Sequence, residues 1–471
     1  MRRTPVLVSL AALALGVSTA MSAVVSAEAV PPSAEPGVAE QQPAASPGAA
    51  AQKAAKSAKQ PKFVKKPKRV MYVGNNWDGT AHIVNAGTYK KLGKLNIIPD
   101  YEERMAEIAA DPDRLAYFLL IREAVGEGHD QFVDDMFSTN DGKIVAVSRP
   151  SFADVVGINV RSRKIVWRFA MHGQRADHMA VSPDGTKLLV SDSTEGHVDE
   201  LDLRTGEPLR QFESGDTPHE SNYSNNGKKI FHASIGTVYT PSDPSLTCPE
   251  PDSSKGDQRF QIVDNKSFEI LEQWDIGEEL RQAGFACMAS AVRPMAISPD
   301  EKTAYLQISF FHGYVVFDLV RGKVVSVVSL PISEAAASTP KAQYVLNSAH
   351  HGLAMNHAGS KLCVAGTMDD YVGLVPIKNP QNRKIFKLRT EGARPYWATE
   401  GPGGNECWVS IAGDDRVNIY DFKRSKQVGT VKVGFHPQRV RVGGLSIKAL
   451  RAWRNGTSVF VPPDTSTSPT S

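Results

Sequence analysis

A short turn of nearly constant composition recurs along this chain about every 43 residues, and an apolar, strand-like run follows each copy. One well-formed copy reads Ser182-Pro-Asp-Gly-Thr-Lys-Leu-Leu-Val, and related copies begin at Thr139, Ser224, Ser298 and Asn356. A degenerate copy begins at Gly401, and a strand without its turn begins at Lys68. A fixed step of this size indicates a repeat fold in which each unit is one supersecondary structure.

A second landmark follows each anchor by about 20 residues, where an alternating apolar strand breaks at a hairpin turn and resumes. These turns begin at Asn85, Asn159, Asp202, Asp264, Asp318, Pro376 and Asp421. Four short strands per unit is the period of a propeller blade, and radial repetition protects the edges of each small sheet. The sequence therefore predicts an all-β, seven-bladed β-propeller over 68–455.

The ends and the insertions of the repeat region carry further expectations. The first unit lacks an innermost strand and 435–442 supplies one, so we expect strands from both termini to close the ring. Insertions interrupt the period at 101–126, 240–257 and 332–348. Apolar residues at helical spacing in the first insertion predict a small helical cap at about 100–126 on one face of the ring.

The N-terminal segment has the composition of an export signal and a linker. Arg2 and Arg3 precede an apolar run and the small residues Val25-Ser-Ala27, which predicts a signal peptide over 1–27 and a secreted protein. An uncleaved anchor is the alternative, although the run is short for a bilayer. The Ala-, Pro- and Lys-rich stretch 28–67 predicts a disordered linker, and 456–471 a flexible tail. The basic cluster at 53–69 could bind anionic cell-wall polymer or remain a solvated tail.

Charge narrows the classes of partner. The chain carries 54 Lys and Arg against 51 Asp and Glu, but the basic excess lies in the N-terminal segment and the propeller itself is mildly acidic. That balance argues against nucleic acid, which needs a basic face. No later apolar run approaches the ~20 residues of a membrane span. We expect a monomer with an extracellular small-molecule or polymer ligand.

Several units resemble repeats of a known family. The Ser182 copy, the segment Val198-Asp-Glu-Leu-Asp-Leu-Arg-Thr-Gly-Glu and the segment Gly215-Asp-Thr-Pro-His219 are similar to YVTN/YncE-type repeats of seven-bladed β-propellers. The superfamily that this resemblance implies includes binding proteins, the large subunit of methylamine dehydrogenase, the N-terminal domain of nitrous oxide reductase and metal-dependent lyases of the virginiamycin B type. Such a resemblance implies the fold and does not choose the function.

The four cysteines fall into two pairs. Cys363 and Cys407 occupy equivalent strands of neighbouring blades, so we expect buried thiols. Cys248 and Cys287 lie outside the regular strands, and an exported chain permits the disulfide that we predict between them. The spacing of none of them fits a thiolate zinc site.

Histidine is concentrated in the loops that enter the innermost strands. These loops surround one end of the central channel in a propeller, and five of the seven contain histidine. The loops carry His129-Asp130, Asp177-His178, Pro218-His219-Glu220, Arg293-Pro294, His350-His351, Arg394-Pro-Tyr396 and His436-Pro437. By contrast, His197, His232 and His312 lie in or beside later strands, where core or surface roles are expected.

The loops around this end of the channel, here called the funnel, support two kinds of chemistry. Neutral imidazoles bind Mn, Zn or Cu, and we predict metal ligands at His129, His178, His350, His351 and His436. Acid–base catalysis also suits the set, with an arginine that stabilises a carboxylate or enolate, and the predicted catalytic residues are His219, Glu220, Arg293 and Arg394. Packing between blades is the alternative role for each histidine.

Three functions remain open. The chain lacks a Gly-rich phosphate loop, a G-x-S-x-G elbow, an H-E-x-x-H motif and a Cys-x-x-Cys-His haem motif. The favoured hypothesis is a secreted, metal-assisted, lyase-like enzyme that acts on an extracellular small molecule or saccharide. The alternatives are a non-catalytic YncE-like binding protein for a cell-envelope ligand and a redox-partner scaffold subunit.

Overall fold

The computed structural model describes residues 67–236, 256–286 and 288–455, which fall within one compact unit. The predicted signal peptide, the linker up to residue 66, the tail from residue 456, and the proposed partners Cys248 and Cys287 lie outside the described residues.

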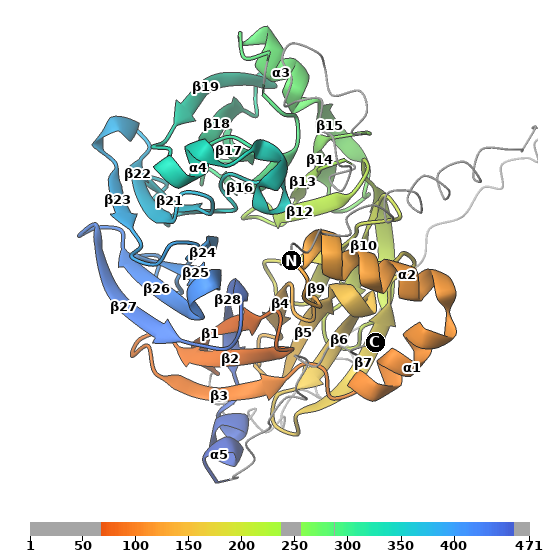
Figure 1. The fold of residues 1–471 in the computed structure, drawn as a ribbon. Helices are drawn as coiled ribbons and strands as arrows, with labels where there is room; N and C mark the ends of the chain where they lie inside the picture. Colours follow the sequence, from red (N-terminus) through yellow and green to blue (C-terminus); the bar gives the residue numbers. More distant parts are fainter. Residues whose placement is uncertain (1–66, 237–255, 287, 456–471) are drawn as a thin grey trace, which may run out of the picture. The chain divides into compact units, whose positions relative to one another are not determined.

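Seven four-stranded antiparallel sheets stand around a common centre (Figure 1). This arrangement confirms the predicted seven-bladed β-propeller. The first three sheets, written from the centre outwards, are β28 (Pro437–Leu445), β1 (Lys68–Asn75), β2 (Thr80–Asn85) and β3 (Lys91–Asn96); β4 (Met136–Ser138), β5 (Ile144–Arg149), β6 (Asp154–Asn159) and β7 (Lys164–Ala170); and β8 (Ala176–Val181), β9 (Lys187–Asp192), β10 (His197–Asp202) and β11 (Pro208–Glu213).

The other four sheets follow the same order. They are β12 (Pro218–Tyr223), β13 (Lys229–Ser234), β14 (Phe260–Asp264) and β15 (Ile270–Trp274); β16 (Val292–Ile297), β17 (Thr303–Ile308), β18 (Gly313–Asp318) and β19 (Lys323–Ser329); β20 (Gly352–Met355), β21 (Lys361–Gly366), β22 (Tyr371–Pro376) and β23 (Lys384–Lys387); and β24 (Pro395–Glu400), β25 (Glu406–Ile411), β26 (Arg416–Asp421) and β27 (Lys426–Lys432).

The recurring turn is built by its own side chains. In the β8–β9 turn, the Ser182 hydroxyl donates to Asp184 at 2.6 Å and accepts from the backbone N–H of Lys187 at 3.0 Å. Gly185 has φ +68°, a left-handed conformation that costs glycine little, and its N–H donates to the Ser182 carbonyl at 2.8 Å. These contacts explain why the turn composition recurs at each copy.

Apolar side chains pack between adjacent sheets. One cluster joins Leu189, Val198 and Phe212 of the β8–β11 sheet to Ile230 and Val263 of the β12–β15 sheet, and all five are buried. Neighbouring innermost strands also contact one another around the centre. In one sheet, β28 pairs with β1 in an antiparallel register, so strands distant in sequence share a blade.

The first insertion forms α1 (Tyr101–Ala110), α2 (Pro112–Leu120) and a π-helical turn (Ile121–Val125). Asp111 caps α2 by accepting from the backbone N–H groups of Asp113 and Arg114. Other helices follow later in the chain: α3 (Ile276–Gln282), α4 (Glu334–Ser338), α5 (Ile447–Asn455), and the 3₁₀ turns Pro150–Phe152, Lys341–Gln343, Val345–Asn347, Pro380–Asn382 and Ala412–Asp414. Among the described helices, none has the length and apolar character needed to cross a bilayer.

Cys363 and Cys407 form a disulfide, which corrects the prediction of two separate thiols. They lie on β21 and β25, and their Cα atoms are 6.4 Å apart, within the range that a disulfide spans. The sequence placed each cysteine in its own blade core. Only the packing of two blades places the two positions against each other.

We expect the double substitution Cys363→Ala, Cys407→Ala to lower the free energy of unfolding by about 2–4 kcal/mol, because the bond constrains the unfolded chain across 44 residues. Denaturant titration of the wild type and the variant measures this difference. Equal midpoints and slopes would show that the bond does not form in solution.

Candidate functional site

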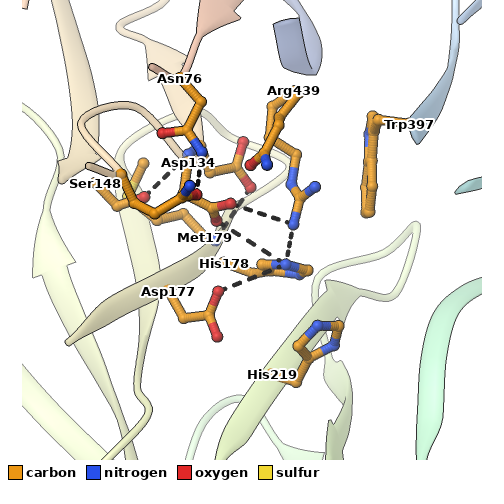
Figure 2. Close-up of polar contacts among 12 residues, drawn as sticks. Asn76, Asp134, Ser148, Asp177, His178, Met179, His219, Trp397 and Arg439 are labelled. Atoms are coloured by element: carbon orange, nitrogen blue, oxygen red, sulfur yellow. Dashed lines mark hydrogen bonds and ion pairs between the residues drawn. The ribbon is translucent and has the colours of Figure 1, made fainter. Parts of the chain in front are cut away.

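Three buried histidines from different blades meet at the centre of the ring. His178 lies on β8, His219 on β12 and His351 directly before β20. The ring centroids of His178 and His219 are 3.9 Å apart, and His351 lies 6.4 Å and 6.1 Å from them. Figure 2 shows the side chains of His178 and His219 between Asp177 and Trp397.

These histidines line a cavity of about 20 Å³, roughly the space that one water molecule or one ion occupies. Val125 of the helical insertion and Leu346 of the later insertion also line it. The helical cap therefore reaches the funnel end of the channel.

Acidic and basic side chains balance each other around the cavity. The Arg441 guanidinium donates two hydrogen bonds to Asp135, at 2.8 and 2.7 Å. Arg439 lies 3.4 Å from Asp134. Three ion pairs form here, Arg175 with Asp177, Arg439 with Asp134 and Arg441 with Asp135. Arg293 and Glu220 add one further charged group of each sign. If all are ionised, the centre carries no net charge.

Trp397 on β24 contacts two of these cations. The guanidinium carbons of Arg439 and Arg441 lie 4.0 and 4.8 Å from the centroid of its ring, which is cation–π geometry. The indole face therefore helps to hold both arginines in the channel.

His178 is surrounded by charged groups (Figure 2). Arg439 donates to its Nε2 atom, which lies 3.5 Å from Asp177 and 3.9 Å from Asp134. Because a guanidinium can only donate, Nε2 accepts and the ring is neutral. Burial, followed by the charge of Arg439, holds the pKa of His178 well below its ordinary value.

Burial shifts the other titratable groups in the same sense, away from the charged form. The pKa values of His219 and His351 lie well below the ordinary value, chiefly because both rings are buried and secondly because arginines are near. Burial also raises the pKa of Asp134 and of Glu220 to about 7. The neutral rings are in the form that binds metal ions.

Several of these groups have polar atoms without partners. Among the described residues, no hydrogen-bond partner exists for the buried Nδ1 of His178, Nδ1 of His219 or Oε2 of Glu220. His178, His219 and Glu220 each offer a ligand atom within 4.8 Å of the other two, and Asp134, Asp177 and His178 form a second such group. These residues could hold a metal ion.

The structure places His350 in a different network from its neighbour His351. Its Nε2 atom lies 2.9 Å from Asp369, whose same oxygen lies 2.7 Å from Nδ1 of His312. The hydroxyl of Tyr344 lies 3.0 Å from Nε2 of His312. His312, His350 and Asp369 each offer a ligand atom within 4.8 Å of the other two. Because their facing atoms already contact one another, the network ties two blades together.

The predicted ligands His129 and His436 stack on Trp77. Ring centroids are 3.9 and 3.6 Å apart, with interplanar angles of 18° and 9°. Among the described residues, neither histidine belongs to a group of converging ligand atoms. Both rings pack against Trp77, away from the His178 and His219 pair.

The predicted catalytic arginines have different positions. Arg293 lines the cavity, where it donates to Ser309 at 2.9 Å and to the Leu346 carbonyl at 2.6 Å. Arg394 instead pairs with Glu127, which follows the helical insertion. Arg293 belongs to the cavity, whereas Arg394 holds the cap.

Sequence reasoning missed Asp134, Arg439 and Arg441 at the channel centre, whereas Asp130, in the His129-Asp130 loop, lies in an ion pair with the helical insertion. Asp130 pairs with Arg122 at 2.6 Å. Arg439 and Arg441 are two positions apart on β28, so they face the same side of the sheet. The alternation of these arginines with Val440 and Val442 is the sequence signal for their shared face. Because buried arginines are rare, the alternation alone does not predict that they enter the channel.

Comparisons with known proteins leave the family open. No protein-family profile and no curated protein sequence matches the chain. Among solved structures, it is similar to the hydrazine synthase of Kuenenia stuttgartiensis at 16% identity and a TM-score of 0.48, over 67% of this chain and 96% of that one. The propeller therefore rests on the seven sheets described above, and YVTN/YncE-type membership stays a prediction.

His232 shows how a buried histidine serves the fold. It lies on β13, and the hydroxyls of Ser214 and Ser221 lie 2.7 and 2.9 Å from its two ring nitrogens. Burial lowers its pKa to about 3. The folded state therefore resists a proton that the unfolded state accepts below about pH 6.5.

We expect wild type to lose stability relative to His232→Gln as pH falls from 6.5 towards 3. The difference should approach about 1.4 kcal/mol per pH unit, and it should be constant above pH 7. Denaturant titrations at several pH values measure it. His357→Gln, at an exposed site, is the control, and parallel curves for wild type and His232→Gln would contradict the expectation.

Proposed function

We propose that this chain is a secreted β-propeller that binds a divalent transition-metal ion at His178, His219 and Glu220 and uses it in lyase-like chemistry on an extracellular small molecule or saccharide. One observation carries the proposal. Nδ1 of His219 and Oε2 of Glu220 are buried and have no partner among the described residues, and these two residues and His178 each offer a ligand atom within 4.8 Å of the other two.

A metal ion accounts for this arrangement better than packing does. A buried polar atom without a hydrogen bond costs on the order of 1–3 kcal/mol, and His219 and Glu220 each contribute one such atom here. Two neutral imidazoles and one carboxylate suit Zn, Mn or Cu. The cavity of about 20 Å³ has room for one ion.

The surroundings of the Arg439 guanidinium favour a positive charge at that position. Its guanidinium contacts Nε2 of His178 and lies 3.4 Å from Asp134. An ion at Nε2 of His178 would displace this contact and leave Arg439 paired with Asp134. Ionisation of Glu220 would offset half of the charge of a divalent ion.

The surrounding residues suit proton transfer. A bound ion would polarise a substrate oxygen. Asp134, with a pKa of about 7, can accept and return a proton near neutral pH. Arg293 and Arg439 line the same cavity and would stabilise a developing anion.

Two features support export. The N-terminal sequence has the pattern of a signal peptide. The disulfide between Cys363 and Cys407 is typical of proteins in oxidising compartments.

A second cavity favours the alternative of a non-catalytic binding protein. The repeat turns that leave the innermost strands line a cavity of about 920 Å³, which includes Asn140, Ser182, His357 and Glu400. This volume lies in the range of small-molecule sites. Retention of a ligand there, with no turnover, is the outcome that separates binding from catalysis.

Metal analysis tests the central site. After loading with Zn²⁺ and dialysis, we expect Glu220→Gln and His219→Ala each to retain about one equivalent less zinc than wild type, because each variant removes a ligand. Glu220→Gln preserves side-chain shape, so it guards against a folding defect. Mass spectrometry of the metal and circular dichroism of the fold provide the measurements.

His357→Ala is the matched control, because this histidine is exposed and lies outside the cluster. It should retain as much zinc as wild type. Unchanged zinc in folded Glu220→Gln and His219→Ala would overturn the central site.

A further inference from the structure

A second group of metal-ligating side chains lies at the seam between two blades. His197 and Asp199 are two residues apart on β10, so both project from the same face of the sheet. His172 follows β7 of the preceding blade. One ligand atom from each of the three lies within 4.8 Å of the others, and none of the three lines the central cavity.

The two strand residues face each other without a hydrogen bond. His197 and Asp199 are 8% and 3% exposed. Nε2 of His197 lies 3.4 Å from Oδ2 of Asp199, yet neither atom has a hydrogen-bond partner in the described part of the chain. The two buried atoms therefore face each other as an ion pair that no hydrogen bond from another described group supports.

The other nitrogen of His197 sets the ring for metal binding. Nδ1 lies 3.3 Å from the Glu195 carbonyl, and a carbonyl can only accept. Nδ1 therefore carries a hydrogen, and Nε2 faces Asp199, whose carboxylate raises the pKa of His197 to about 9. A metal ion at Nε2 would replace the proton that this pair holds. Metal-binding histidines are commonly oriented in this way, by a hydrogen bond from the opposite nitrogen.

The loop that carries His172 is anchored on the same face. The backbone N–H of Gly173 donates to Asp192 at 2.8 Å, and Asp192 is the cross-strand partner of His197. A Cβ atom at Gly173 would lie 2.3 Å from that carboxylate and 2.1 Å from the Thr194 hydroxyl. Only glycine lets the loop approach this closely, and the approach brings His172 to the site.

We propose that His172, His197 and Asp199 form a second metal site, for a borderline divalent ion such as Zn²⁺, Cu²⁺ or Co²⁺. Two imidazoles and one carboxylate are the ligand set that these ions prefer. Three protein ligands leave coordination positions open, and exposed His172 gives an ion access from solvent.

A cavity of about 270 Å³ opens beside His172, and both basic and acidic side chains line it. Arg104 and Arg168 are paired with carboxylates, which leaves Arg114 as the cation that could meet an anionic group. Arg114 donates to the carbonyls of Gln174 and Ser151, both at 2.8 Å, which holds its guanidinium in place. An anion bound to the ion would lie beside this cation.

Titration of the full chain with Co²⁺ alone tests this site, because cobalt bound to imidazole absorbs visible light. We expect wild type to bind two equivalents and His172→Ala to bind the second at least tenfold more weakly. Since His172 is exposed, this variant should fold normally. Asp199→Asn, which preserves shape, should have the same effect, and His357→Ala should bind as wild type.

Chemical modification gives an independent readout. Cobalt should protect His172 from diethylpyrocarbonate in wild type, and this protection should be lost in Asp199→Asn. Cobalt binding by His172→Ala equal to wild type, or no protection of His172, would show an ion pair only and overturn the proposal. Loss of signal in His172→Ala with none in Glu220→Gln would overturn the central site and leave this one standing.

Discussion

Each four-stranded sheet of this protein can bury its faces only against the sheets beside it. Clusters such as Leu189 and Phe212 against Ile230 and Val263 fill the seams, and the ring of innermost strands is the result. Because adjacent sheets twist and pack in the same way at each step, the side chains that enter the centre come from many blades. Everything at the centre depends on this packing.

Burial at the centre decides the chemistry of the residues there. The pKa values of His178, His219 and His351 lie well below the ordinary value because the rings are buried, and burial raises the pKa of Glu220 to about 7. Neutral rings beside a carboxyl group favour metal ligation over ion pairing. The same principle explains His232, where two serine hydroxyls satisfy a ring that stays neutral.

Of the histidines predicted around the channel, the structure brings His178, His219 and His351 together. The sequence indicated which loops approach the channel, because position within the repeat determines that. It could not separate His351, in the cavity, from His350, which bonds to Asp369, since adjacent side chains at the start of a strand point in different directions. It also treated Cys363 and Cys407 as separate thiols, although the blade interface joins them.

The sequence by itself determined the seven blades, because turn chemistry such as that of Ser182, Asp184 and Gly185 is local and repeats with the chain. The tertiary structure alone decided which histidines share a site. His172 meets His197 across a seam, and Arg439 meets His178 across the channel. Such contacts join residues far apart in sequence, and their distances depend on how the blades pack.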